Sequence, residues 1–143
     1  MEELSEGDPH AVALENARRK AAAVGAAGSE LVLGVDTLVA LDGRIYGKPA
    51  DEAQARATLR ALSGRTHQVI SGIALGARSA TATTLVTFRD VEPWLEDYVA
   101  TGEWRGRAGG YAIQGAGAVL VTRIEGDYLN VVGLPVATLI DLL

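Results

Sequence analysis

Cysteine is absent from the sequence, which excludes disulfide bonds, thiolate zinc sites and cysteine nucleophiles. Long apolar runs are absent too, since none approaches the roughly 18 residues that a membrane-spanning helix requires. The first residues are acidic, unlike those of a signal or transit peptide. These absences favour a cytoplasmic protein that has no membrane partner.

Basic residues are in the minority, with 13 Lys and Arg against 18 Asp and Glu and a net charge of −5. Proteins that follow a nucleic-acid backbone usually carry a basic surplus, so a nucleic-acid partner is not expected. Lysine is especially rare, because eleven of the basic residues are Arg and two, Lys20 and Lys48, are Lys. Each lysine retained in such a sequence is worth testing for a specific role.

The length of 143 residues and the absence of repeats, linkers and charge blocks predict a single domain over residues 1–143. Helix signals predict helices at 8–24, 51–62, 93–101 and 136–143, and runs rich in Val, Ile and Thr predict strands within 30–41, 67–75, 81–88 and 118–124. Asp42-Gly43 is typical of a hairpin turn. Strands that alternate with single helices indicate an α/β fold with a mixed, twisted sheet flanked by helices.

The first helix is expected to run through Ala11, Leu14, Ala17, Ala21 and Val24 and to end near residues 25–28. The last helix is expected to form a core stripe at helical spacing, made of Val136, Leu139, Ile140 and Leu143.

Asp36 interrupts an apolar run, with Leu31–Val35 before it and Leu38–Leu41 after it. Burying a carboxylate is costly unless it is paired, hydrogen-bonded or bound to a metal. One interpretation is therefore a site carboxylate. The other is a bulge or strand end at which Asp36 and Thr37 hydrogen-bond to the backbone.

Lys48 and Gln114 have the same two kinds of interpretation. Lys48 precedes Pro49, which disfavours a helix at the lysine, so an extended side chain there could meet a phosphate or simply be solvated. Gln114 lies in a glycine-rich stretch, where its amide could read a base or bond the local backbone. Lys20 lies on an alanine-rich predicted helix, where a lysine is usually just solvated. The segment around Arg65, taken alone, favours a structural role over a chemical one.

Five segments together resemble the Maf family in their order and approximate spacing. They are Gly34–Val39, Gly47–Pro49, Leu62–His67, Ala108–Gly115 and Gly126–Pro135. The resemblance extends from about Lys20 to Leu143 and includes both lysines.

This resemblance implies an inosine-triphosphatase-like fold and a nucleoside triphosphate pyrophosphatase that cleaves between the α- and β-phosphates with Mg²⁺ or Mn²⁺. The Asp-Thr pair, with Arg-Thr-His downstream, is similar to the branch that prefers dTTP and UTP. The implied roles are Asp36 as general base and metal ligand, Lys20 and Lys48 as phosphate ligands, Thr37 and Gln114 in substrate choice, and Arg65 as a further substrate-binding cation. A homodimer is also implied.

The sequence departs from the family pattern at its start. The family opens with a strand and a Ser-x-Ser-Pro-Arg-Arg loop, whereas Arg18-Arg19 lies within a predicted helix. We therefore expect the first family strand to be missing and these 143 residues alone to be weakly active or inactive. A non-catalytic nucleotide-binding or septum-regulating remnant is the alternative function. Gly106 and Arg107 also stand where Asp-Lys is common.

Overall fold

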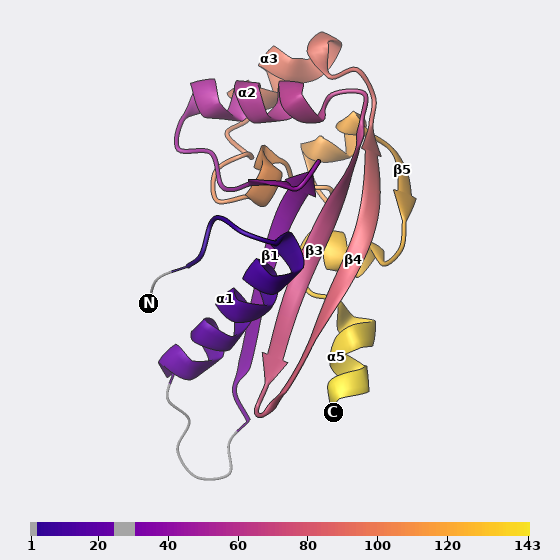
Figure 1. Ribbon diagram of the computed structural model, residues 1–143. Helices are drawn as coiled ribbons and strands as arrows, with labels where there is room; N and C mark the ends of the chain where they lie inside the picture. Colours follow the sequence, from indigo (N-terminus) through magenta and orange to yellow (C-terminus); the bar gives the residue numbers. More distant parts are fainter. Residues whose placement is uncertain (1–2, 25–30) are drawn as a thin grey trace.

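The computed structural model describes residues 3–24 and 31–143 (Figure 1). The helices are α1 (Pro9–Val24), α2 (Glu52–Leu62), α3 (Glu92–Ala100), α4 (Tyr128–Val132) and α5 (Val136–Leu142), with 3₁₀ turns η1 (Ala108–Gly110) and η2 (Ala116–Leu120). The strands are β1 (Leu33–Leu41), β2 (Arg44–Tyr46), β3 (Thr66–Leu75), β4 (Arg78–Phe88) and β5 (Val121–Glu125). Among the described residues, no helix is both long and apolar enough to cross a membrane.

Local signals in the sequence set several element boundaries. The Asp8 carboxylate accepts the Ala11 N–H at 3.0 Å at the start of α1, and the Asp51 carboxylate accepts the Gln54 N–H at 2.8 Å at the start of α2. Asp42 and Gly43 both have positive φ, 52° and 77°, as a two-residue hairpin turn between β1 and β2 requires. These predicted features are confirmed.

The described strands form one five-stranded sheet in the order β2-β1-β3-β4-β5, and every pairing is antiparallel. The expectation of an α/β fold is confirmed, but that of a mixed sheet is wrong. Figure 1 shows the reason: α2 lies at the end of the sheet where β1 ends, so the chain re-enters from that end and β3 runs opposite to β1. A parallel pair would need α2 to cross the face of the sheet.

Different elements pack on the two faces of the sheet. On one face, α1 packs on β1 and β3 through a small cluster that includes Val12, Ala13, Leu38 and Ile70. The other face carries the larger core, to which α2, α3 and the segment after them contribute, and α4 lies against β3 and β4 there. Because alternate strand residues point to opposite faces, consecutive residues of β1 face these two different environments.

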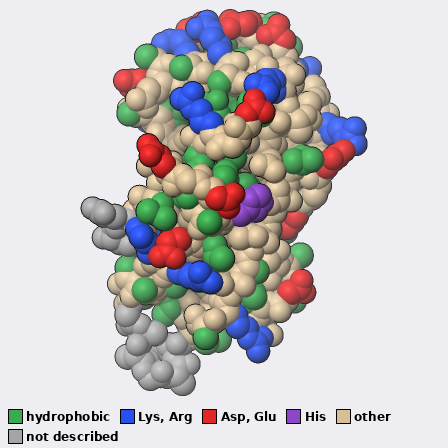
Figure 2. Space-filling view, viewed as in Figure 1, with side chains coloured by type: hydrophobic (Ala, Val, Ile, Leu, Met, Phe, Trp, Pro, Cys, Tyr) green, Lys and Arg blue, Asp and Glu red, His purple; other side chains and the backbone are tan. Residues whose placement is uncertain are grey.

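Charged side chains are spread over the visible face of the molecule, including the end that carries α2 and α3 (Figure 2). Figure 2 shows acidic and basic groups interspersed over α2 and α3, where Arg56 pairs with Glu96 at 3.0 Å and Arg60 with Glu92 at 2.6 Å. Exposed pairs of this kind each stabilise a fold by only about 0–1 kcal/mol. The contact between α2 and α3 therefore depends mainly on buried residues such as Leu59.

One edge of β1 is open. β2 pairs only with Val39–Leu41, and within the described part of the chain no strand pairs with Leu33–Leu38 on that side. The backbone of these six residues is held by β3 alone. This open edge is where the cavity described below lies.

The helix expected to run from Ala11 to Val24 forms as α1, and its buried residues are Val12, Ala13, Asn16 and Ala17. The predicted strand at 118–124 begins as the 3₁₀ turn η2 and becomes β5 at Val121. The predicted end of the first helix, at 25–28, lies outside the described residues.

The last helix forms, but its apolar stripe is not part of the core. No residue of α5 is buried, and the side chains of Ile140 and Leu143 are 59% and 74% exposed. Helical periodicity reports one apolar side, whereas burial depends on what packs against that side. The helix contacts β4, whose Arg78 donates to the Leu142 carbonyl at 3.1 Å.

Candidate functional site

Asp36 lies in the middle of β1, opposite Gly72 of β3, and its side chain is 7% exposed. It faces α1, and two residues one turn apart on that helix reach it. Lys20 Nζ donates to Asp36 Oδ1 at 2.8 Å, and Asn16 Nδ2 donates to Oδ2 at 3.1 Å. The carboxylate is thus paired with a lysine and hydrogen-bonded to an amide in a largely buried position.

Close packing of α1 brings these partners into reach. Gly34 and Gly72 are on the face of the sheet that α1 covers, and a Cβ atom on either would overlap backbone atoms of the helix. Gly34 lies under Ala17, and Gly72 lies under Ala13. The helix therefore approaches the sheet at two positions where a side chain is missing; Asp36 is two residues from Gly34 along β1 and pairs directly with Gly72.

Lys20 has a second acidic partner. Its ammonium is 3.0 Å from Glu3 Oε1 as well as 2.8 Å from Asp36 Oδ1. Burial alone would lower the pKa of Lys20, but hydrogen bonds to Asp36 and Glu3 outweigh it and raise that pKa. The hydrogen bond from Lys20 lowers the pKa of Glu3, and the charge of Lys48 adds to this. Lys20 is therefore a permanent cation at this end of the site.

Asn16 was not singled out by sequence reasoning, yet it organises this end of the site. Its side-chain oxygen accepts the Leu4 N–H at 2.6 Å, and its Nδ2 donates to the Leu4 carbonyl at 2.9 Å. The third bond, from the same Nδ2, goes to Asp36. The sequence held one signal for Asn16. It is four residues before Lys20 on an alanine-rich helix, and this spacing places both side chains on the same face.

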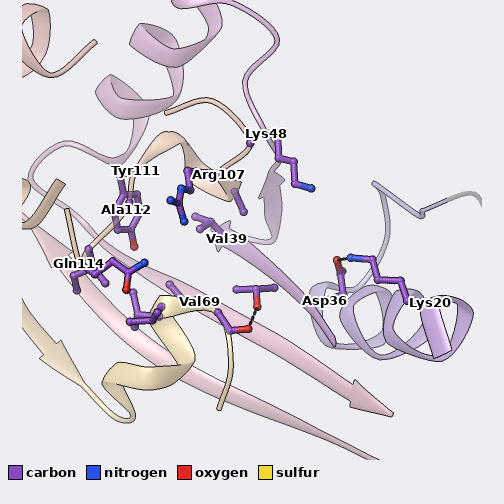
Figure 3. A pocket seen from close by; sticks show the side chains of 16 residues that line it. Lys20, Asp36, Val39, Lys48, Val69, Arg107, Tyr111, Ala112 and Gln114 are labelled. Carbon is purple, nitrogen blue, oxygen red and sulfur yellow. Dashed lines mark hydrogen bonds and ion pairs between the residues drawn. The ribbon is translucent and has the colours of Figure 1, made fainter. Parts of the chain in front are cut away.

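A cavity of about 210 Å³ runs from Asp36 along the open edge of β1 (Figure 3). Its lining includes five of the six predicted site residues, namely Lys20, Asp36, Thr37, Lys48 and Gln114. Figure 3 shows the Asp36–Lys20 pair at one end and Gln114 with Tyr111 at the other. A second cavity of about 390 Å³ adjoins the first at Asp36, Thr37 and Lys48. The fold thus assembles segments that are far apart in the sequence.

Arg65 is the predicted site residue that the structure does not bring to this cavity. It precedes β3 at the end of the sheet, where its guanidinium pairs with the Asp42 carboxylate of the β1–β2 turn at 2.6 Å. Both side chains are largely exposed. Because β1 and β3 are antiparallel neighbours, the start of β3 lies beside the turn that follows β1. This placement does not support the interpretation of Arg65 as a substrate-binding cation.

Thr37 faces the opposite side of β1 from Asp36, as strand alternation requires. Its hydroxyl shares a hydrogen bond with the Ser71 hydroxyl at 2.7 Å and donates to the Gly133 carbonyl at 3.4 Å. Asp36 and Thr37 both line the cavity although they are on opposite faces, since the cavity reaches around the unpaired edge of the strand. The alternative of a bulge at this point is excluded by the unbroken register from Leu33 to Ala40.

The loop that carries Gln114 is held by a second feature that the sequence did not reveal. The Glu103 carboxylate accepts the N–H groups of Ala116 and Gly117, both at 2.9 Å, and the Tyr98 hydroxyl donates to it at 2.9 Å. Burial tends to raise the pKa of Glu103, but these bonds outweigh it and lower the pKa. The loop therefore presents an exposed Gln114 amide from a fixed backbone.

His67 and Tyr111 form a buried pair behind the cavity. His67 is fully buried, and its Nε2 is 2.6 Å from the hydroxyl of Tyr111, whose ring lines the cavity. Both rings make edge contacts with Phe88. Burial lowers the pKa of His67 to about 4.

The buried histidine predicts a loss of stability in acid. Unfolded His67 would titrate near pH 6.5, so between pH 6.5 and about 4 the unfolded chain binds a proton that the folded chain excludes. Stability is therefore lost as the pH falls through this window, by about 2 kcal/mol between pH 7.5 and pH 5. The His67→Gln variant, which can still bond Tyr111, should lose about 2 kcal/mol less over the same range in urea unfolding. His10, which is only partly buried, provides the control, and His10→Gln should show the same loss over this pH range as wild type.

The residues present fit a divalent cation that arrives with a phosphate ligand. In the described part of the chain, no three His, Asp or Glu side chains gather into a ready-made metal site. Mg²⁺ is commonly held by one or two carboxylates together with substrate phosphates and waters. Asp36 supplies such a carboxylate, and each of its oxygens accepts one hydrogen bond from the described residues and retains a lone pair for a cation.

Known proteins resemble this chain over most of its length. The family model described as "Maf-like protein" matches residues 1–143. A dTTP/UTP pyrophosphatase of Moorella thermoacetica is 51% identical, over 93% of this chain and 71% of the relative. Proteins with the same name from Deinococcus radiodurans and Pyrococcus furiosus are 45% and 41% identical, over 99% of this chain and 76% and 78% of the relatives. The chain belongs to the Maf family.

Proposed function

We propose that this chain is an enzyme that hydrolyses dTTP and UTP to the nucleoside monophosphate and pyrophosphate. The observation that carries the proposal is the cavity, which joins a buried carboxylate, two lysines and a glutamine from four separate segments. The relatives named dTTP/UTP pyrophosphatase, 41–51% identical, support the same activity.

The end of the cavity near α1 is the proposed phosphate end. Lys20 and Lys48 offer positive charge to the triphosphate, and Asp36 accepts the proton of the attacking water as the bond between the α- and β-phosphates breaks. The electron pair of that bond leaves with pyrophosphate. Asn16 and Lys20 hold the carboxylate in place, so Asp36 needs little reorganisation to act.

A divalent cation, Mg²⁺ or Mn²⁺, would be held by Asp36 and the phosphates and would supply further neutralisation of charge. Lys48 forms no ion pair with any described residue, so its charge is available to the same phosphates. A site with a single carboxylate is suited to a cation that enters with its substrate.

The other end of the cavity is the proposed base end. The exposed Gln114 amide offers two donors and an acceptor, which match the carbonyl and N–H groups of a pyrimidine edge. Thr37 adds a hydroxyl whose position Ser71 fixes. Selection by hydrogen bonds of this kind disfavours a purine, whose edge would leave the Gln114 amide without matching partners.

We also propose that residues 1–143 act as one domain of a cytoplasmic homodimer. Several apolar side chains of α4, α5 and the segment between them are exposed, among them Leu129, Leu134 and Ile140. A second copy of the chain would remove such side chains from water.

The test is a hydrolysis assay over dTTP, UTP, CTP, ATP and GTP, with Mg²⁺, with Mn²⁺ and with a chelator. Concentrated protein and long incubations allow slow turnover to be measured. Equal amounts of monophosphate and pyrophosphate are expected from dTTP and UTP, at a kcat/KM about tenfold or more above that for purine triphosphates. Chelation should abolish the signal.

Two results would contradict this proposal. Release of orthophosphate in place of pyrophosphate would place the cleaved bond elsewhere. Binding of dTTP with no turnover in either metal would favour the non-catalytic alternative.

A further inference from the structure

Arg107 is a cavity residue to which the site described above assigns no role. It lies in the loop between Trp104 and η1, and Figure 3 shows its side chain between Tyr111 and Lys48. Among residues 3–24 and 31–143, the Arg107 guanidinium has no hydrogen-bond or ion-pair partner. A cation that lines a cavity without an internal partner is available to a ligand.

The loop presents this guanidinium from a fixed position. Gly109 N–H donates to the Gly47 carbonyl at 3.2 Å, and Arg107 N–H donates to the Trp104 carbonyl at 3.3 Å. Gly109 has a φ of 71°, and a Cβ there would lie 2.8 Å from Val39 of β1. The loop therefore packs directly on the strand that carries Asp36.

Charge balance makes Arg107 important. Three cations, Lys20, Lys48 and Arg107, and one carboxylate, Asp36, line the cavity, so its lining carries a net charge of +2. Glu3 and Glu103 lie outside the lining and interact with Lys20 and Arg107, respectively. Removal of Arg107 would halve the net positive charge that the lining offers to a polyanion.

We propose that Arg107 binds the α-phosphate of the nucleotide. This assignment rests on the proposed function, because it takes the Asp36 end for the bond between the α- and β-phosphates and the phosphates beyond it, and the Gln114 end for the base. The α-phosphate lies between these groups in the substrate, as Arg107 lies between Tyr111 and Lys48 in the cavity. A guanidinium matches two phosphate oxygens at once, which a lysine cannot do.

The experiment measures binding, so that it does not depend on turnover. Affinities for dTMP and thymidine are determined by titration for the wild type, Arg107→Ala, Arg107→Lys and Arg105→Ala. Arg105 is the matched control, since it is two residues away and stacks on the Trp104 ring at 4.7 Å outside the cavity. Melting temperatures verify that the four proteins are equally folded.

Arg107→Ala is expected to weaken dTMP about 10- to 100-fold and to leave thymidine unchanged, because only dTMP carries the phosphate. Arg107→Lys should keep part of the affinity, and Arg105→Ala all of it. An unchanged affinity for dTMP, an equal loss for thymidine, or a wild type that does not bind dTMP would each overturn the assignment. Dependence of dTMP binding on Arg107 without pyrophosphate release in the hydrolysis assay would retain the α-phosphate site and refute the proposed function.

Discussion

Replacing Asp36 with asparagine is expected to lower turnover of dTTP and UTP by about 10²- to 10⁴-fold, since the amide cannot accept the proton of the attacking water. The fold should survive, because the asparagine oxygen can still accept from Lys20. The new amide nitrogen would face the Asn16 amide, so a loss of about 1 kcal/mol in the free energy of unfolding is expected. Steady-state pyrophosphate release and thermal melting measure the two effects.

The control for this variant is Asp42→Asn. Asp42 is exposed, pairs with Arg65 and lies outside the cavity, and asparagine tolerates its positive φ. Turnover of this control should match wild type. If the folded Asp36→Asn protein turned over at a rate near that of the control, Asp36 would not be the general base.

The second large effect is expected from Gly72→Ala. A Cβ at this position would overlap the Ala13 carbonyl, so α1 must move away from the sheet. Overpacking against backbone leaves little room for relaxation, and a loss of about 3 kcal/mol or more in the free energy of unfolding is expected. Turnover should fall with it, because α1 carries Asn16 and Lys20. Urea unfolding and the hydrolysis assay measure both quantities.

Gly47→Ala is the matched control for stability, since a Cβ there would meet no atom within 4 Å and the φ of Gly47 is not positive. Wild-type stability for Gly72→Ala would show that α1 adapts easily. The close approach of helix to sheet would then not be what fixes Asn16 and Lys20 beside Asp36.

The sequence predicted the elements better than their packing. Capping aspartates and the Asp42-Gly43 turn act locally, so they can be read from a few neighbouring residues. The buried face of α1 could not be read in this way, because an alanine-rich helix has weak periodicity and packs here on glycines of two strands. The antiparallel direction of β3 depends on where α2 lies, which no local pattern records.

In the candidate site, too, local features could be predicted and contacts between distant segments could not. Asp36 was identifiable because a carboxylate inside an apolar strand needs a partner, and the structure supplies Lys20 and Asn16. Asn16 and Glu103 were missed because their contacts join segments more than ten residues apart. Arg65 belongs to a motif of the family, yet its position at the end of β3 gives it Asp42 as a partner.

The open edge of β1 has a consequence for motion. β3 is hydrogen-bonded on both sides over most of its length, whereas Leu33–Leu38 is bonded only to β3 within the described residues. Local opening of a segment costs less free energy when fewer backbone bonds must break. The strand segment that carries Asp36 is therefore among the parts of the sheet that fluctuate most easily, and a ligand seated in the cavity would restrain it.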